Sequence, residues 1–281
     1  MVRSSILPYL VFVCLNLILF YALIAYPSSE NLPKSPNPIL LSETKPVYEA
    51  GRDQNDPELL SYIKSLLMPP SGKPYSLKNP KRKHFTAFEQ STFVGDLYGP
   101  AQREGFFLEV GAFDGEESSS TLYLERELGF KGLLIEPSPI NWAKLVKKQR
   151  KSFLLNAALS PTTTAEELIF TGSGQQGHLV NAKSRQSYPV KAFPLYAILQ
   201  ALNITFIDVF NLDIEGFEFK VLNTIPWNEV KLGIMIVEHL NIPEPHEEVV
   251  KFMESTGYQK IHENHFDYIF ADPNYLKKLK G

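Results

Sequence analysis

The segment Phe106-Phe-Leu-Glu-Val-Gly-Ala-Phe-Asp-Gly115 decides the fold that this sequence predicts. It begins with a nearly continuous apolar run, which is typical of a buried strand. Glu109, Gly111 and Gly115 form the pattern E-x-G-x-x-x-G, and glycines let a backbone turn tightly and approach a ligand closely. The loop is not the G-x-G-x-x-G of dinucleotide enzymes, and no G-K-[ST] follows it. The sequence therefore disfavours NAD and ATP as ligands.

Strand and helix patterns alternate along the chain from Gly105 onwards. We expect strands at 106–110, 132–135, 153–159, 206–214 and 232–237, and helices at 118–128, 138–151, 194–202 and 247–256. Two short strands at 258–261 and 268–270 are expected to form an antiparallel hairpin. This alternation predicts an α/β fold at 105–281, a single Rossmann-like domain whose mostly parallel sheet is covered on both faces.

The second predicted strand ends in Glu136-Pro137, 21 residues beyond Gly115. In dinucleotide-binding folds an acidic side chain about 20 residues beyond the glycine loop accepts hydrogen bonds from a ribose diol. A surface glutamate that caps the next helix is the alternative for Glu136 taken alone. The spacing, the strand context and the glycine loop together favour a ribose contact.

Acidic side chains also stand at the ends of the later strands. Asp213 and Glu215 end the fourth strand, where alternation predicts that both share one face, and Glu238 with His239 ends the fifth. Buried carboxylates are costly unless they bind a cation, pair or hold a proton. Because ligands bind beyond the carboxyl ends of parallel strands, these residues predict a site at that edge. A divalent ion held by the carboxylates and an imidazole stays open, and no metal ligand is assigned.

Several segments carry a resemblance to a known family. FFLEVGAFDGEESSSTLYLE, GLLIEPSP, NAALS and IDVFNLDIEGFEFKVL resemble the FkbM-type branch of S-adenosylmethionine-dependent methyltransferases. With GHLVNAKS, TIPW and the apolar N-terminus, the sequence is similar to the Star family of single-pass membrane proteins. The resemblance covers about Phe106 to Pro273. One departure is Phe113-Asp114, where many enzymatic members carry an Ala-Asn pair.

The resemblance implies S-adenosylmethionine as cofactor and assigns roles to named residues. It implies a cofactor-binding set of Glu109, Gly111, Ala112, Asp114, Gly115, Glu136 and Ala157, with the segment 156–158 bordering the adenine. It places Asp213 and Glu215 on the acceptor side. A methyl transfer to a hydroxyl also needs a base for the leaving proton, and Asp213, Glu215 and His239 are the catalytic candidates.

The N-terminus predicts a membrane anchor. Ile6 to Tyr26 is almost continuously apolar, and its 21 residues would span roughly 30 Å as a helix, which is the thickness of a bilayer core. A cleaved signal peptide is the alternative, but its apolar region is usually only about 7–15 residues long. We expect residues 1–5 to form a short cytosolic tail and 6–26 a transmembrane signal anchor in the lipid bilayer. The remainder would lie in the secretory lumen, as in a type II protein.

Residues 27–104 are expected to form a Pro-rich stem. Eleven of the 21 prolines lie between Pro27 and Pro100, which argues against a packed domain there. Within it, 57–68 carries apolar residues at helical spacing and predicts a short helix that packs on the domain or on a partner. A sole cysteine, Cys14, excludes a disulfide scaffold and a Cys-rich zinc module.

Three functions remain open at this stage. The first is an O-methyltransferase. The second, implied by the Star resemblance, is a non-catalytic adaptor that moves membrane-anchored cargo of the growth-factor type through the endoplasmic reticulum, Golgi and endosomal membranes. The third is a Golgi metal-dependent glycosyltransferase, suggested by the anchor, the stem and Asp213-x-Glu215. The net charge of −3 gives no signal for nucleic acid as a partner.

Overall fold

A computed structural model describes residues 48–86, 88–99, 104–172, 174, 177–180 and 187–280. These residues lie within one compact unit, 45–281. The predicted tail at 1–5 and the predicted anchor at 6–26 fall outside the described residues. Among the helices of the described part, none has the length and apolar character that a membrane crossing requires.

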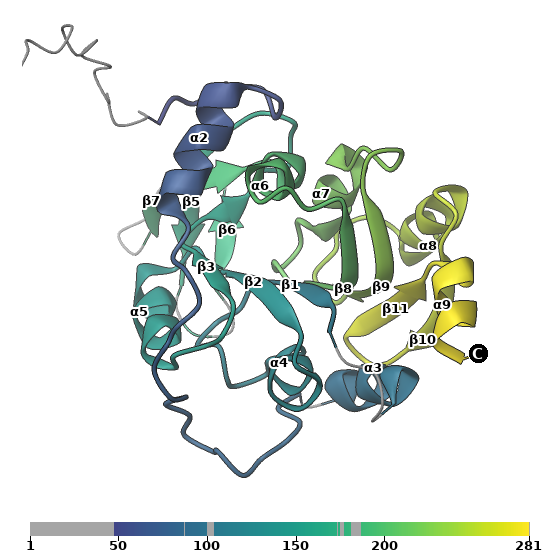
Figure 1. Cartoon of the computed structure of the whole chain (residues 1–281). Coiled ribbons are helices and arrows are strands. Elements are labelled where there is room, and N and C mark those ends of the chain that lie inside the picture. Colours follow the sequence, from purple (N-terminus) through teal and green to yellow (C-terminus); the bar gives the residue numbers. More distant parts are fainter. Residues whose placement is uncertain are drawn as a thin grey trace, which may run out of the picture. The chain divides into compact units, whose positions relative to one another are not determined.

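The main sheet has seven strands in the order β10-β11-β9-β8-β1-β2-β3 (Figure 1). Their bounds are β1 Phe106–Val110, β2 Lys131–Ile135, β3 Phe153–Leu155, β8 Phe206–Leu212, β9 Lys231–Glu238, β10 Gln259–Glu263 and β11 Asp267–Ala271. Five neighbouring strands of this sheet run parallel, namely β3, β2, β1, β8 and β9. Strand β11 is antiparallel to both of its neighbours, β9 and β10. The mostly parallel sheet and the C-terminal antiparallel hairpin are thus confirmed.

Helices cover both faces because side chains alternate along each strand. One face packs on α2 (Pro57–Leu66), α6 (Leu195–Ala201), α7 (Glu218–Thr224) and α8 (His246–Ser255). The other packs on α3 (Gln90–Tyr98), α4 (Leu122–Leu128), α5 (Pro139–Lys147) and α9 (Pro273–Lys280). In β1, for example, Leu108 and Val110 belong to the first core and Phe107 to the second. Figure 1 shows α2 and α6 on one side of the sheet and α3 and α4 on the other.

A second, four-stranded sheet follows β3 in the chain. Its order is β4-β7-β5-β6, with β4 Ala158–Leu159, β5 Glu166–Thr171, β6 His178–Val180 and β7 Ser187–Phe193. The predicted single strand at 153–159 is therefore wrong, since its two halves belong to different sheets. The break falls at Asn156, whose side-chain amide donates to the carbonyl oxygen of Glu136 at 2.7 Å and holds the chain as it leaves the main sheet.

The predicted stem at 27–104 is also wrong from residue 48 onwards. Leu59 and Ile63 of α2 are only 1% and 0% exposed and belong to the core beneath α6. The backbones of Met68 and Leu154 exchange two hydrogen bonds of 2.9 Å at the edge of β3. Prolines exclude regular strands but not an extended segment that buries a few anchoring side chains. The predicted short helix does pack on the domain.

Candidate active site

A cavity of about 400 Å³ opens at the carboxyl ends of β1, β2, β8 and β9. This volume falls within the range of small-molecule sites, roughly 300–1,000 Å³. The main sheet supplies one wall, while Phe170 and Leu179 of the second sheet and Phe88 before α3 supply others. The position is the one that an open parallel sheet predicts for its ligand.

The turn after β1 forms the floor of this cavity. The N–H groups of Gly111 and Ala112 both donate to the carbonyl oxygen of Ile135 at 3.1 Å, which joins the ends of β1 and β2. Gly111 has φ +80°, and a Cβ atom there would lie 1.9 Å from the carbonyl oxygen of Asp213. A glycine is therefore required both by the backbone conformation and by the close approach of β8.

Glu136 lies at the end of β2 and lines the cavity. Its two carboxylate oxygens accept the N–H groups of Phe113 and Ser138, each at 2.8 Å. Only 3% of Glu136 is exposed, and this burial raises its pKa to about 7. Oε1 also accepts from the side-chain amide of Asn141 at 3.5 Å, whereas Oε2 keeps a second lone pair that can accept from a ligand hydroxyl. The structure thus places Glu136 where a ribose contact is predicted, and that contact stays a prediction.

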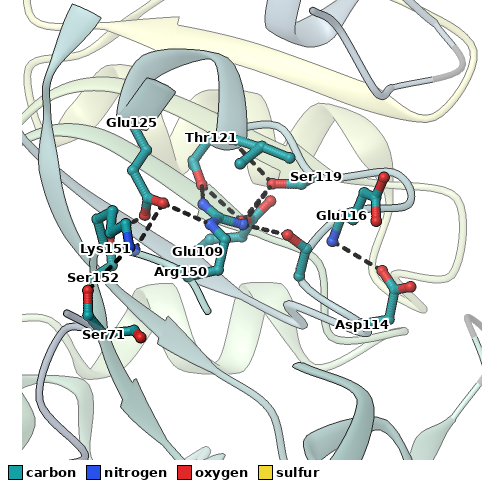
Figure 2. Close-up of polar contacts among 12 residues, drawn as sticks. Ser71, Glu109, Asp114, Glu116, Ser119, Thr121, Glu125, Arg150, Lys151 and Ser152 are labelled. Atoms are coloured by element: carbon teal, nitrogen blue, oxygen red, sulfur yellow. Dashed lines mark hydrogen bonds and ion pairs between the residues drawn. The ribbon is translucent and has the colours of Figure 1, made fainter. Parts of the chain in front are cut away.

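Glu109 forms the back of the cavity and is held by the loop before α4 (Figure 2). Its carboxylate accepts from the Ser119 hydroxyl at 2.9 Å, the Thr121 hydroxyl at 2.7 Å and the Ser120 N–H at 2.7 Å. Burial raises the pKa of Glu109, although Arg150 nearby opposes the rise. The predicted helix at 118–128 begins only at Leu122, because the residues before it donate hydrogen bonds to the Glu109 carboxylate.

Arg150 supports the glycine loop from behind the cavity. Figure 2 shows its guanidinium between Glu125 and the loop, and its Nε lies 3.0 Å from the Glu125 carboxylate. Both side chains are fully buried. Arg150 also donates to the carbonyl oxygen of Gly115 at 2.5 Å, while Glu125 accepts from the Ser152 hydroxyl. The turn that carries Gly111 is therefore braced by a buried charge network.

Three predicted cofactor residues do not line the cavity. The Asp114 carboxylate pairs with Lys148 at 3.0 Å, outside the cavity. A Cβ at Gly115 would lie 2.3 Å from the Leu145 side chain, so this glycine serves packing against α5. Ala157 is 1% exposed and sits in the core, whereas the next two residues along the chain reach the cavity. The predicted contacts of Asp114, Gly115 and Ala157 are corrected accordingly.

The acceptor side of the cavity is strongly acidic. Asp213, Glu215, Glu238 and Asp267 all line it. Asp213 is exposed to the cavity, and desolvation of its carboxyl group there, followed by the charges of Glu238 and Glu215, raises its pKa well above the usual range. Burial, followed by the charges of Glu218, Glu215 and Asp267, raises the pKa of Glu238 to about 8. Asp213 and Glu215 do not follow simple alternation, because β8 ends at Leu212 and Glu215 has φ +57°.

His239 is not at the cavity, contrary to its prediction as a candidate base. Its ring stacks on Tyr268 with centroids 4.1 Å apart, and its Nε2 donates to the carbonyl oxygen of Asn264 at 3.3 Å. Adjacent residues at the end of β9 point in different directions, so Glu238 faces the cavity and His239 packs against β11.

Backbone strain concentrates around the same cavity. Phe113, Ser118 and Glu215 are non-glycine residues with φ of +48°, +60° and +57°, and all three line it. Such conformations cost on the order of 1–3 kcal/mol each and persist where the surrounding structure holds them, often at functional sites. At position 113 the strain coincides with the Phe-Asp departure noted in the sequence.

Sequence patterns did not reveal part of the lining. Gln90 at the start of α3 donates to the Asp267 carboxylate at 2.5 Å, and both residues line the cavity. Asp267 is an acid at the start of an apolar strand, which is a signal that the hairpin pattern contained. Gln90 and Phe88 carry no comparable signal, since their place depends on how the segment before β1 folds back.

Comparison with known proteins gives the family. The sequence pattern of the Methyltransferase FkbM domain matches residues 109–260, which is more than half of the chain. The chain belongs to the FkbM methyltransferase domain family. The cofactor of this FkbM domain is S-adenosylmethionine. No curated protein sequence matches the chain.

Among solved structures, the FkbM domain is similar to several methyltransferases. M. capricolum TrmK in complex with S-adenosylhomocysteine has 11% identity and a TM-score of 0.37, covering 67% of this chain and 68% of that one. The precorrin-6y C5,15-methyltransferase of Geobacter metallireducens has 10% identity and a TM-score of 0.38, covering 64% and 86%. The TehB-like methyltransferase of Corynebacterium glutamicum has 10% identity and a TM-score of 0.36, covering 65% and 87%.

The charge of the cavity fits this cofactor. Among the described residues that line it there are seven carboxylates and no Lys, Arg or His: Glu109, Glu117, Glu136, Asp213, Glu215, Glu238 and Asp267. A sulfonium cation is favoured in such surroundings because opposite charges attract strongly away from bulk water. The family match and this charge favour methyl transfer over the glycosyltransferase hypothesis.

Proposed function

We propose that the FkbM domain is an S-adenosylmethionine-dependent O-methyltransferase that acts on a hydroxyl group. The observation that carries this proposal is Asp213, which faces the cavity among three further carboxylates. A hydroxyl becomes a nucleophile when a base of suitable pKa takes its proton, and carboxylates whose pKa is raised toward neutrality suit that task. Asp213 is the catalytic residue in this proposal.

In this proposal one side of the cavity binds the cofactor and the other side binds the acceptor hydroxyl. When bound, S-adenosylmethionine supplies a methyl group on a sulfonium sulfur and leaves as the neutral thioether. Glu136 accepts hydrogen bonds from the ribose hydroxyls, and Gly111 provides room for the ligand beside the β1 turn. Asp213 accepts the proton of the acceptor hydroxyl, and Asp267 helps to exclude bulk water as a buried neighbour.

Binding and turnover of two variants test this division. Glu136→Gln should weaken S-adenosylhomocysteine binding about tenfold or more, since a charge-assisted hydrogen bond contributes roughly 1.5–3 kcal/mol. Asp213→Asn should keep S-adenosylhomocysteine binding within about threefold and lose methyl transfer, because a neutral amide cannot take the proton. Glu247→Gln removes one charge from the exposed surface of α8, outside the cavity, and serves as the control. Equal affinity of the wild type and Glu136→Gln would refute the placement of the cofactor.

We also propose that the chain is a type II membrane protein of the endoplasmic reticulum, Golgi and endosomal membranes, anchored through residues 6–26. The sequon Asn203-Ile-Thr205 supports a luminal domain, since Asn203 and Thr205 are both exposed. It precedes β8 and so lies at the opposite end of that strand from the cavity. Asn203→Gln should remove a glycan in cells, and the protein should resist carbonate extraction. An unmodified Asn203 together with protease access from the cytosol would refute this topology.

An adaptor that moves membrane-anchored cargo is the alternative within the same membranes, and it is supported by the Star-like sequence features. The two functions make different demands on the cavity. An adaptor needs the fold but not the cofactor, so Glu136→Gln should leave cargo movement unchanged. Loss of cargo movement in a folded Glu136→Gln variant would tie transport to the methyltransferase site.

A further inference from the structure

Three carboxylates from three different elements converge beside the cavity. Asp213 follows β8, Glu218 begins α7 and Glu238 ends β9. One oxygen from each lies within 4.8 Å of the oxygens of the other two. Glu218 is 0% exposed and Glu238 is 6% exposed, so two of the three are removed from bulk water.

Glu238 carries an independent sign of a missing partner. Its Oε1 accepts the N–H of Leu240 at 3.1 Å, but its Oε2 is buried and, within the described residues, accepts no hydrogen bond. A buried carboxylate oxygen without a donor costs free energy that a bound cation would offset. The side chain lines the cavity, and its neighbours there are the carboxylates of Asp213 and Asp267.

Glu218 is already oriented for such a role. Its Oε1 accepts the N–H of Ile214 at 2.7 Å, and its Oε2 accepts the N–H of Gly216 at 2.9 Å. Each oxygen keeps another lone pair. Ligands of metal ions are commonly fixed by hydrogen bonds of this kind, which set the direction of the remaining lone pairs.

Within the described residues, no basic side chain lowers the pKa of any of the three acids through its charge. The described residues that line the cavity include no Lys, Arg or His, and each of the three acids has other acids as its nearest charged groups. Burial and mutual repulsion raise the pKa of Glu218 and of Glu238 to about 8. A bound cation would compensate the repulsion among these carboxylates.

We propose that Asp213, Glu218 and Glu238 bind one hard divalent cation, Mg²⁺ or Mn²⁺. Carboxylate oxygens are the ligands that these ions prefer, and softer metals would call for the Cys or His that this group lacks. Three protein oxygens leave further coordination positions in an octahedral site. These positions open toward the cavity, because Asp213 and Glu238 line it.

The cation also suggests the class of acceptor, an inference that rests on the proposed function. Adjacent open positions suit two neighbouring oxygens of one molecule, such as a vicinal diol or a hydroxyl beside a carbonyl. Binding to a divalent cation lowers the pKa of a hydroxyl and so favours its deprotonation. With one oxygen of Asp213 bound to the cation, its second oxygen would take the proton of the acceptor hydroxyl as the O–CH₃ bond forms and the bond from the methyl group to the sulfonium sulfur breaks.

Titration of the full-length chain with Mn²⁺, followed by calorimetry and electron paramagnetic resonance after treatment with EDTA, tests the site. The wild type should bind one Mn²⁺ per chain. Glu238→Gln and Asp213→Asn should each weaken Mn²⁺ binding at least tenfold. Glu247→Gln, which removes an exposed carboxylate of α8 outside the cavity, should stay within about twofold.

Two further readouts separate the possible failures. Glu238→Gln should fold, because an uncharged amide of nearly the same size replaces a carboxyl group that has no basic partner, so its melting temperature without metal should match or exceed that of the wild type. The rise in melting temperature that Mn²⁺ gives the wild type should vanish in Glu238→Gln. A wild type that binds S-adenosylhomocysteine but no Mn²⁺, or equal Mn²⁺ binding in Glu238→Gln, would overturn the cation site alone. Mn²⁺ binding without S-adenosylhomocysteine binding would support the cation site and refute the proposed function.

Discussion

Gly111 lies directly against Asp213, because a Cβ atom at position 111 would be only 1.9 Å from the Asp213 carbonyl oxygen. The N–H of Asp213 also donates to the carbonyl oxygen of Val110 at 3.2 Å. The turn on the cofactor side and the carboxylate on the acceptor side are therefore fixed by the same joint between β1 and β8. A substitution that displaces the turn at Gly111 should therefore also displace Asp213.

Gly111→Ala should consequently damage both stability and binding. The substitution combines a positive φ with a collision against backbone, which cannot rotate away as a side chain can. Strain and overpacking each cost on the order of 1–3 kcal/mol, so we expect a loss of roughly 2–6 kcal/mol in the free energy of unfolding. Urea unfolding and S-adenosylhomocysteine titration measure the two effects.

Gly129→Ala is the matched control for this prediction. Gly129 ends α4 with φ +71°, close to that of Gly111, but nothing lies within 4 Å of its Cβ position. It should lose only the backbone contribution, on the order of 1–2 kcal/mol, and keep ligand binding. Equal losses for the two variants would mean that the contact with Asp213 contributes nothing.

Arg150→Met should destabilise the domain strongly. Removal of the guanidinium leaves the buried Glu125 and Glu109 without their nearest positive charge. Loss of one partner from a buried ion pair typically costs about 3–5 kcal/mol. Lys251→Met provides the comparison, since its pair with Glu247 is 74% and 85% exposed, and such pairs contribute about 1 kcal/mol or less. Urea unfolding of both variants at pH 7 measures the difference, and similar losses would contradict the structural role of Arg150.

The sequence predicted the main sheet well because its strands carry strong local patterns. The strands Phe106–Val110 and Lys131–Ile135 are mostly apolar, and each is followed directly by candidate site residues. Their alternation with helices predicts that they run parallel in one sheet. Glu136 could be placed for the same reason, since it stands at a strand end at a known distance from the glycine loop. Asp114 could not, because only the fold shows that Lys148 draws it away from the cavity.

Long-range packing decided the features that local patterns missed. The second sheet depends on pairing of Glu166–Thr171 with Ser187–Phe193, strands that mix charged and apolar residues on a partly exposed surface. The prolines between residues 48 and 100 suggested a free stem, yet Leu59 and Ile63 anchor that segment in the core. A proline-rich composition indicates that a segment forms little regular secondary structure. It does not indicate whether a few apolar side chains of that segment are buried in the core.

Stability should depend on pH through Glu136. Burial raises its pKa from 4.5 to about 7 in the folded protein, so between these values the folded state binds a proton that the unfolded state has released. The contribution of Glu136 to stability is therefore full below about pH 4.5 and is lost as the pH rises to 7. The slope is about 1.4 kcal/mol per pH unit within this window. Urea unfolding with EDTA at pH 5.5, 6.5 and 7.5 should show this fall, and Glu136→Gln should make it shallower, since Glu218 and Glu238 have raised pKa values too. A stability that rises from pH 5.5 to 7 in the wild type would contradict the raised pKa.

A chain that begins at Lys45 should fold, whereas one that begins at Ser71 should not. The longer chain keeps α2, which buries Leu59, Tyr62 and Ile63 with 1%, 8% and 0% exposure. Burial of a large apolar side chain stabilises by roughly 1.5–3 kcal/mol, so loss of these three is comparable to the whole stability of a domain, about 5–15 kcal/mol. The point variant Ile63→Ala tests the contribution of this buried side chain without shortening the chain, and it should cost about 2–5 kcal/mol in the free energy of unfolding.

Circular dichroism and thermal melting measure all three proteins. If the chain from Ser71 melted cooperatively near the temperature of the longer one, α2 would be an attachment to the domain rather than part of its core. In that case the segment before Ser71 would behave as part of the stem that the sequence predicts.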